Sequence, residues 1–124
     1  MEVDERKLLD WGARIGVQAK KEGVRRAQFE GILASLELSK DEKNSLLLTA
    51  AYAHRQAQRL RGRETARLIN RALAEILRYG GGKSEARKVL GVAKWVYETV
   101  ESSKVQGVNL TTLTFEKYLQ LLRS

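Results

Sequence analysis

The chain has 124 residues, no cysteine, no proline and a formal net charge of +8 at pH 7. This length fits one domain with one core, and the lack of cysteine excludes disulfides, thiolate metal ligands and a cysteine nucleophile. No apolar run reaches the roughly 20 residues of a membrane span, and the start MEVDERKLLDW is too acidic for a signal sequence, so we expect a single soluble domain, residues 1–124, in the cytoplasm.

Leu, Ala, Arg, Lys, Glu and Gln dominate the composition, and aromatic residues make up only 6% of it. The dominant residues are those with high helix propensity. Apolar positions recur at intervals of three and four along the chain, which is the spacing of helices with one buried face. The sequence therefore predicts an all-α fold, a single compact bundle of five to six helices.

The first two predicted helices span about 4–22 and 25–36, with Gly23 between them. Each carries an apolar stripe that we expect in the core: Leu8, Trp11, Ile15 and Ala19 on the first, and Phe29, Ile32, Leu33 and Leu36 on the second. Ser39 and Glu42 then have the spacing of a capping box, whose hydroxyl and carboxylate satisfy free amides at a helix start. A third helix is therefore expected over about 40–61.

The third predicted helix is expected to be central, because small residues on its stripe let a neighbouring helix approach closely. That stripe comprises Leu46, Ala50, Ala53, Ala57 and Leu60. A fourth helix, 63–79, follows Gly62 and is expected to bury Ala66, Ile69, Leu73, Ile76 and Leu77. A fifth, 84–104, is expected to bury Val89, Ala93, Val96 and Val100. A sixth begins near 112 and is expected to pack through Phe115, Tyr118, Leu119 and Leu122.

The positive charge is concentrated in one part of the chain. Residues 54–94 hold eleven Lys or Arg against three acids, whereas 1–53 hold nine of each sign and 95–124 hold three of each. A surface that serves only solubility carries its charges more evenly. A localised excess of this kind instead favours a polyanionic partner.

Arginines of the third and fourth predicted helices recur at helical spacing. Four of them fall within a sector about 80° wide on the side of the fourth helix opposite its core stripe: Arg63, Arg67, Arg71 and Arg78. Arg55 and Arg59 share one side of the third helix, with Arg61 nearby. Guanidiniums about 6 Å apart along a helix are comparable with phosphate spacing, and each offers forked donors to phosphate oxygens. The alternative is a solvated face whose arginines pair with acids such as Glu64 and Glu75.

Trp95, on the fifth predicted helix, lies about 160° from the core stripe at Ala93 and on the same side as Lys88. An exposed indole beside cations can stack on an unpaired base. Packing of Trp95 against another helix or a sister subunit is the alternative, and both interpretations remain open here.

The segment GGGKS, residues 80–84, resembles a phosphate loop only superficially. The nucleotide motif requires glycine where position 77 is leucine, and it requires a strand where the preceding segment is predicted to be helical. Lys83 and the start of the following helix can instead hold one backbone phosphate, since helix N-termini attract anions. A simple hinge between antiparallel helices is the alternative.

The sequence contains no recognisable catalytic or metal-binding set. His54 is the only histidine and has no thiol or carboxylate pair beside it that would complete a metal shell. A serine or threonine nucleophile lacks a partner base. We therefore expect a protein that is not an enzyme and that takes no cofactor or metal.

Three segments in order, LLDWGARIG (8–16), FEGILASL (29–36) and LLLTAAYAHRQAQR (46–59), resemble the small subunit of CRISPR ribonucleoprotein effector complexes, of the type III and archaeal type I-A forms. The resemblance covers roughly residues 8–79 and includes an aliphatic-Ala-Tyr-Ala-x-Arg pattern that ends at Arg55. It implies a non-catalytic bundle that stacks with copies of itself along guide RNA and target strand. Arg55 and Arg59 are the only binding residues that carry over, and the segment TLTFEKYLQLLRS does not align.

The first hypothesis is therefore a helical subunit that binds RNA or single-stranded nucleic acid by its backbone. A second is a DNA-binding regulator with RETARLINRALAEILR (63–78) as the recognition helix of a helix-turn-helix. A third is a protein-interaction adaptor whose basic face docks an acidic partner. A membrane partner is not expected, because each bulky apolar stripe is assigned to the core.

Overall fold

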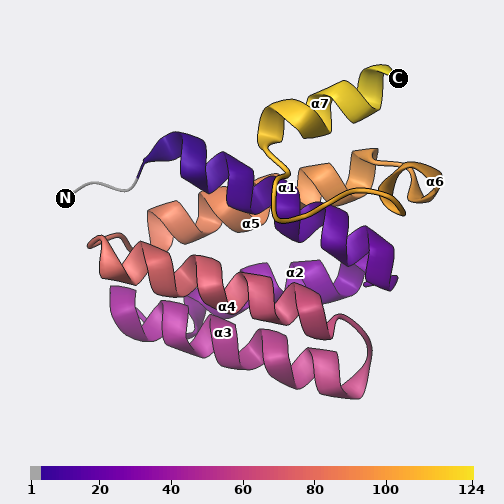
Figure 1. Ribbon diagram of the computed structural model, residues 1–124. Coiled ribbons are helices and arrows are strands. Elements are labelled where there is room, and N and C mark those ends of the chain that lie inside the picture. The colour runs from indigo at the N-terminus through magenta and orange to yellow at the C-terminus, as the bar shows by residue number, and fades with distance from the viewer. Residues whose placement is uncertain (1–3) are drawn as a thin grey trace.

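Seven α-helices and one short 3-10 helix make up the computed structural model, which describes residues 4–124 (Figure 1). The helices are α1 (Glu5–Glu22), α2 (Arg26–Ser35), α3 (Glu42–Arg59), α4 (Arg63–Arg78), α5 (Lys83–Thr99), α6 (Ser102–Val105) and α7 (Phe115–Arg123), and the 3-10 helix η1 (Leu36–Leu38) follows α2. The all-α prediction is confirmed for the described residues, which contain no strand. The helix count is seven, against the five to six predicted.

The additional helix arises because the predicted fifth helix is interrupted at Val100. This residue is extended, with φ −79° and ψ 137°, and its side chain is buried at 2% exposure. The chain therefore leaves the helical path where the isopropyl group enters the core. Glu101, also extended, precedes the single-turn α6.

The predicted capping box at Ser39 and Glu42 is wrong. Asp41 caps α3, since its carboxylate accepts a hydrogen bond from the Asn44 amide at 2.7 Å, while the Ser39 hydroxyl accepts from the Asp41 amide at 3.1 Å. The Glu42 carboxylate turns away from its own helix and accepts from the Lys83 amide at the start of α5, at 2.9 Å. The Gly23 stop after α1 is confirmed, because Gly23 takes the left-handed conformation at φ +70°.

The main core lies among α1 to α5. Helix α4 packs between α1 and α3, while α2 and η1 cover the other side of α3, and α1 packs along α5 (Figure 1). The largest fully buried side chains of this core come from all five helices and η1: Ile15, Phe29, Leu36, Leu46, Ile69, Leu73, Ile76 and Leu90.

A second, smaller core lies on the outer side of α1 and α5, beneath α6 and α7. It joins Val17 of α1 and Val96 of α5 to Val105, Leu113 and Tyr118. The apolar face of α7 is only partly covered there. Tyr118 is buried, but Leu119 and Leu122, which were predicted to be core residues, are each 39% exposed. Leu60, also predicted in the core, lies beyond the end of α3 and is exposed.

Candidate nucleic-acid interface

Helices α3 and α4 form an antiparallel hairpin whose tight turn depends on Gly62. At φ +104° this residue occupies the left-handed region, which side chains with a Cβ rarely adopt. A Cβ there would also lie 2.8 Å from Cγ2 of buried Val24. The turn therefore brings two arginine-bearing helices side by side along one edge of the molecule (Figure 1).

The four predicted arginines of α4 all point away from the core. We call Arg63, Arg67, Arg71 and Arg78 the α4 row; each is exposed. Arg67 lies two residues before buried Ile69, which places it about 160° around the helix from that residue. The row therefore faces solvent along the whole length of α4, between its neighbours α1 and α3.

The two arginines of α3 also face outward, but they do not continue the α4 row. Arg55 lies two residues after buried Ala53, about 160° around the helix from it. Arg59 lies nearer the side that carries Tyr52, whose ring sits against Gly31 of α2. Arg55 and Arg59, which we call the α3 pair, thus lie on the outer side of α3. The seam between α3 and α4 separates them from the α4 row. We call the six arginines together the hairpin face.

Arg61 leaves the hairpin face at the turn. Its guanidinium reaches toward the end of α1, where a Cβ on Gly23 would lie 3.0 Å from its Nη1 atom. A cation is favoured there by the carbonyl groups at the helix C-terminus. Arg61 is exposed, but it extends the positive surface around the end of the bundle and not along the hairpin.

Few acids neutralise the hairpin face. Glu64 pairs with Arg67, and this is the only ion pair that any of the six arginines makes within residues 4–124. Glu75 lies on the edge of α4 that faces α1, about 40° around the helix from Arg71, and its carboxylate accepts a hydrogen bond from the indole of Trp11 at 2.5 Å. Of the two acids in the alternative interpretation, Glu64 alone forms an ion pair with an arginine of the stripe within residues 4–124.

A polar hollow of about 240 Å³ opens between the two helices of the hairpin. His54 and Gln58 line it from α3, and Arg63 and Arg67 line it from α4, with Ala57 also contributing. The sequence analysis did not connect His54 or Gln58 with the arginines. The sequence does contain a signal for this hollow. His54 and Gln58, and Arg63 and Arg67, are each spaced i, i+4 on either side of the Gly62 turn, and an antiparallel hairpin brings two such pairs opposite each other.

Lys83 and the glycine segment before it do not join this surface. Lys83 is buried, and its ammonium is 3.9 Å from the carboxylate of Glu37. The Lys83 amide is bound by Glu42, and the Gly82 amide donates to Glu85 at 2.7 Å. The chain's own carboxylates thus occupy the helix start that was predicted to hold a phosphate, and we leave Lys83 out of the interface.

Trp95 is 68% exposed but lies on another face of the molecule. Thr99, one turn further along α5, bonds the Tyr118 hydroxyl of α7 at 2.5 Å, so this side of α5 faces α7. Lys88, on the same side, has its ammonium 3.2 Å from the carboxylate of Glu5. Trp95 and Lys88 therefore lie on the same side of α5, as their spacing predicts, and Glu5 lies beside Lys88.

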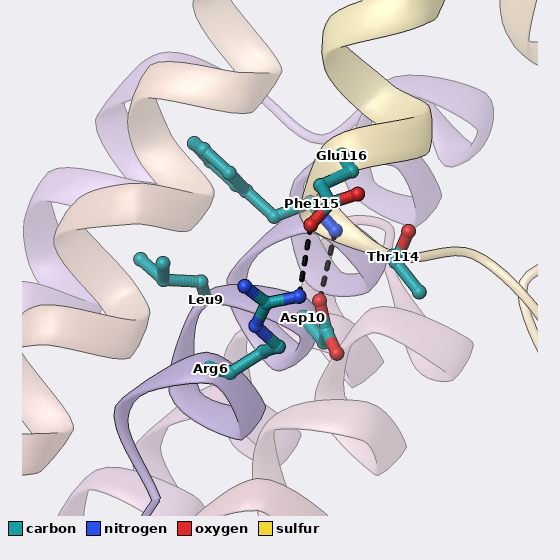
Figure 2. Close-up of a pocket in the computed structure, with 6 residues that line it drawn as sticks. All are labelled: Arg6, Leu9, Asp10, Thr114, Phe115 and Glu116. Atoms are coloured by element: carbon teal, nitrogen blue, oxygen red, sulfur yellow. Dashed lines mark hydrogen bonds and ion pairs between the residues drawn. The ribbon is translucent and has the colours of Figure 1, made fainter.

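Trp95 and Lys88 lie on the side of α5 that faces α7, and α5 packs chiefly against α1. Trp11 of α1 turns toward α4 and Gly16 toward α5, and the outer side between them is covered by α7 and the loop before it. Figure 2 shows this joint, where Asp10 accepts a hydrogen bond from the Phe115 amide at 2.9 Å. Neither Trp95 nor Lys88 lies on α3 or α4, the two helices that carry the six arginines. We therefore leave Trp95 and Lys88 out of the interface.

The hollow in Figure 2, about 300 Å³, is the joint between α1 and α7. Its charged groups serve each other, since Arg6 and Glu116 form an ion pair at 2.8 Å and Asp10 caps α7. No group of three or more His, Asp or Glu side chains that could hold a metal ion occurs in the described residues. Among helices of the same part of the chain, none is long and apolar enough to cross a bilayer.

The carboxyl group of Glu37 has a clearly perturbed pKa, and Glu37 does not belong to the hairpin face. The hydrogen bond from Arg87 lowers the pKa of Glu37 below its ordinary value, and the same bond raises the pKa of Arg87. The pair ties η1 to α5. It is a structural contact between two exposed side chains.

Comparison with known proteins found no matching family model, no similar curated protein and no matching solved structure. The function is therefore argued from the site itself.

Proposed function

We propose that this protein is a non-catalytic subunit that binds RNA or single-stranded nucleic acid through the phosphate backbone, using the hairpin face. The observation that carries the proposal is that six exposed arginines share one hairpin and only Arg67 has an acidic partner within residues 4–124. Unpaired guanidiniums at a surface release counterions from phosphates on binding, which is the main source of affinity without sequence preference.

The residue types on the hairpin face favour recognition of phosphates over recognition of bases. Arginine presents forked donors that match phosphate oxygens. Asn70 is the one amide side chain of α4, and it lies about 100° around the helix from buried Ile69, toward the seam with α3. A recognition helix that reads duplex DNA needs several side chains reaching base edges. The surface therefore suits a strand held by its backbone.

The ribonucleoprotein context of the proposal rests on the resemblance of residues 8–79 to small subunits of CRISPR effector complexes. In that context the protein lies along a guide RNA and its target with other subunits, including copies of itself. Cleavage belongs to other components. The backbone-binding proposal stands on the charges of the hairpin and does not depend on this context.

The test measures affinity for single-stranded RNA, single-stranded DNA and duplex DNA over a salt series. Contact with about five phosphates predicts that log affinity falls with log salt at a slope of about −4. Replacing Arg67 and Arg71 by Glu should reduce affinity strongly and flatten the slope by about 1 to 2, because two phosphate contacts are lost.

The matched control replaces Lys117 and Arg123 of α7 by Glu, which changes the net charge equally at a site away from the hairpin. This control should retain most of the wild-type affinity and slope. Equal weakening by the two variants would show that only net charge matters. Binding that ignores salt would reject the proposal outright.

A further inference from the structure

We propose that the hollow between α3 and α4 is a seat for one internal phosphodiester group, at which a polynucleotide backbone is anchored. The inference rests on the proposed function and makes it more specific. It divides the hairpin face into one shaped contact, formed by His54, Gln58, Arg63 and Arg67, and an outer set of arginines that attract the strand only by charge.

The polar side chains that line the hollow are rich in donors. Arg63 and Arg67 stand one turn apart on one wall, and His54 and Gln58 stand one turn apart on the other. Two guanidiniums, an imidazole and an amide supply N–H groups from opposite directions. The lining includes no carboxylate from the described residues. A tetrahedral anion has oxygens that point in several directions, so it can accept hydrogen bonds from both walls at once. A planar carboxylate is less suited to donors on opposite sides.

Three of the four donor side chains are also free to bind. Within residues 4–124 the side chains of His54, Gln58 and Arg63 make no hydrogen bond or ion pair, and Arg67 bonds Glu64. Ala57, only 6% exposed, also lines the hollow and is too small to fill the space between the walls. The volume of about 240 Å³ leaves room for a phosphate together with part of its sugars.

The charge of the hollow selects an internal phosphodiester over a terminal phosphate. Arg63 and Arg67 contribute two positive charges, and Glu64, paired with Arg67, offsets one of them. One net positive charge matches the single negative charge of a phosphodiester. A terminal phosphate carries about −1.5 to −2 at pH 7 and would be left partly uncompensated.

The remaining arginines of the hairpin face do not line the hollow. Arg55, Arg59, Arg71 and Arg78 are exposed, and none of them is among the residues that line it. At such positions a lysine serves as well as an arginine, because the contact is a screened point charge. At Arg63 and Arg67 the forked geometry is part of the contact, so a lysine is a poor replacement.

The experiment compares charge-preserving variants. Binding of a single-stranded RNA with hydroxyl groups at both ends is measured for Arg63→Lys and Arg67→Lys, with Arg71→Lys and Arg78→Lys as matched controls. The first two should each weaken binding by about 5-fold, and the controls by less than about 2-fold. The salt slope should stay unchanged in all four variants, because the number of charges is the same.

The single histidine supplies a second readout that does not depend on any variant. The ring signals of His54 in an NMR spectrum of the wild-type protein should shift and saturate with the same RNA. The same RNA with a 5′-phosphate should produce the same saturation and no tighter binding at this site.

Three outcomes separate the two proposals. If the RNA binds with the expected salt slope but the His54 signals stay still and all four lysine variants behave alike, the seat is rejected and backbone binding stands. If a 5′-phosphate tightens the His54 response severalfold, the seat takes terminal phosphates and the phosphodiester assignment is overturned. If the wild-type protein binds no RNA at low salt, the proposed function itself fails.

Discussion

Two glycines on the inner face of α1 let α1 and α5 pack with their backbones close together. A Cβ added to Gly16 would lie 2.5 Å from the carbonyl oxygen of Ala93 and 2.6 Å from Cβ of Val96. One added to Gly12 would lie 2.6 Å from Cγ1 of Val92. Because a carbonyl oxygen of α5 is among these atoms, a larger residue requires one helix to move.

Replacing Gly16 by Ala should therefore destabilise the protein by about 1 to 3 kcal/mol through overpacking, despite the better helix propensity of alanine. The control is Gly91→Ala on α5, where an added Cβ meets nothing within 4 Å. That change should stabilise the protein by up to about 1 kcal/mol. Urea denaturation monitored by circular dichroism gives both values, and a Gly16→Ala protein as stable as Gly91→Ala would contradict the packing account.

At the scale of residues, the sequence indicated most of the apolar core but not these glycines. Stripes such as Ile69, Leu73 and Ile76 were predicted from their spacing and are buried. Gly12 and Gly16 fall inside the first predicted helix, and no packing role is predicted for them, since glycine carries no apolar signal of its own. The role of Gly12 and Gly16 becomes visible only where they pack against the valines of α5. That contact is part of the tertiary structure and has no local signal in the sequence.

Three helices are capped by carboxylates from other helices: α7 by Asp10, as described above, and α4 and α5 by two glutamates. Glu22, at the end of α1, accepts hydrogen bonds at the start of α4 from the Thr65 amide at 2.7 Å, the Thr65 hydroxyl at 2.6 Å and the Glu64 amide at 3.2 Å. Glu42 serves α5 in the same way. Rules that look for a cap within a few residues of the helix start cannot find these caps, so the role of Glu42 at α5 had no local signal. The start of α3 is capped locally, but by Asp41 and not by Ser39.

Replacing Glu22 by Ala should destabilise the protein by about 1 to 3 kcal/mol, because Thr65 is buried and its donors would lose their acceptor. Glu22→Gln keeps an acceptor oxygen and should lose distinctly less. Thermal and urea unfolding of the two variants measure the difference. If both variants unfold like the wild type, Glu22 does not hold the start of α4.

The arrangement of helices also determines which charged groups meet. Periodicity predicted the α4 row on one side of its helix, and the structure places these arginines on that side. Whether Arg61, Lys83 and Trp95 belong to the same surface depends on the path of the Gly62 turn and on how α5 and α7 pack. The sequence carries no local signal for that packing, so the predicted site was broader than the surface that the structure supports.

At the scale of the whole molecule, the hairpin face concentrates positive charge, and within residues 4–124 only one of its six arginines, Arg67, has an ion-pair partner. Like charges held close together destabilise the folded state, and salt screens that repulsion. The surface that we propose for binding is therefore expected to lower the stability of the free protein.

Replacing Arg55, Arg71 and Arg78 by Gln should leave the fold intact and make the free protein at least as stable as the wild type at low salt. The unfolding temperature of the wild type should rise more steeply with salt than that of the variant, since more repulsion is screened. Calorimetry at several salt concentrations tests this. A variant that unfolds at a lower temperature throughout would show that these arginines support the fold.

The two cores have a consequence for how the chain can change. All six arginines of the hairpin face lie between Arg55 and Arg78, within α3, the Gly62 turn and α4. The spacing between these arginines is therefore set by one short segment of the chain. Helices α6 and α7 pack on a separate apolar cluster. Insertions or lost turns in the C-terminal quarter would leave the geometry of the arginines intact, so that quarter is free to diverge while the hairpin keeps its ligand.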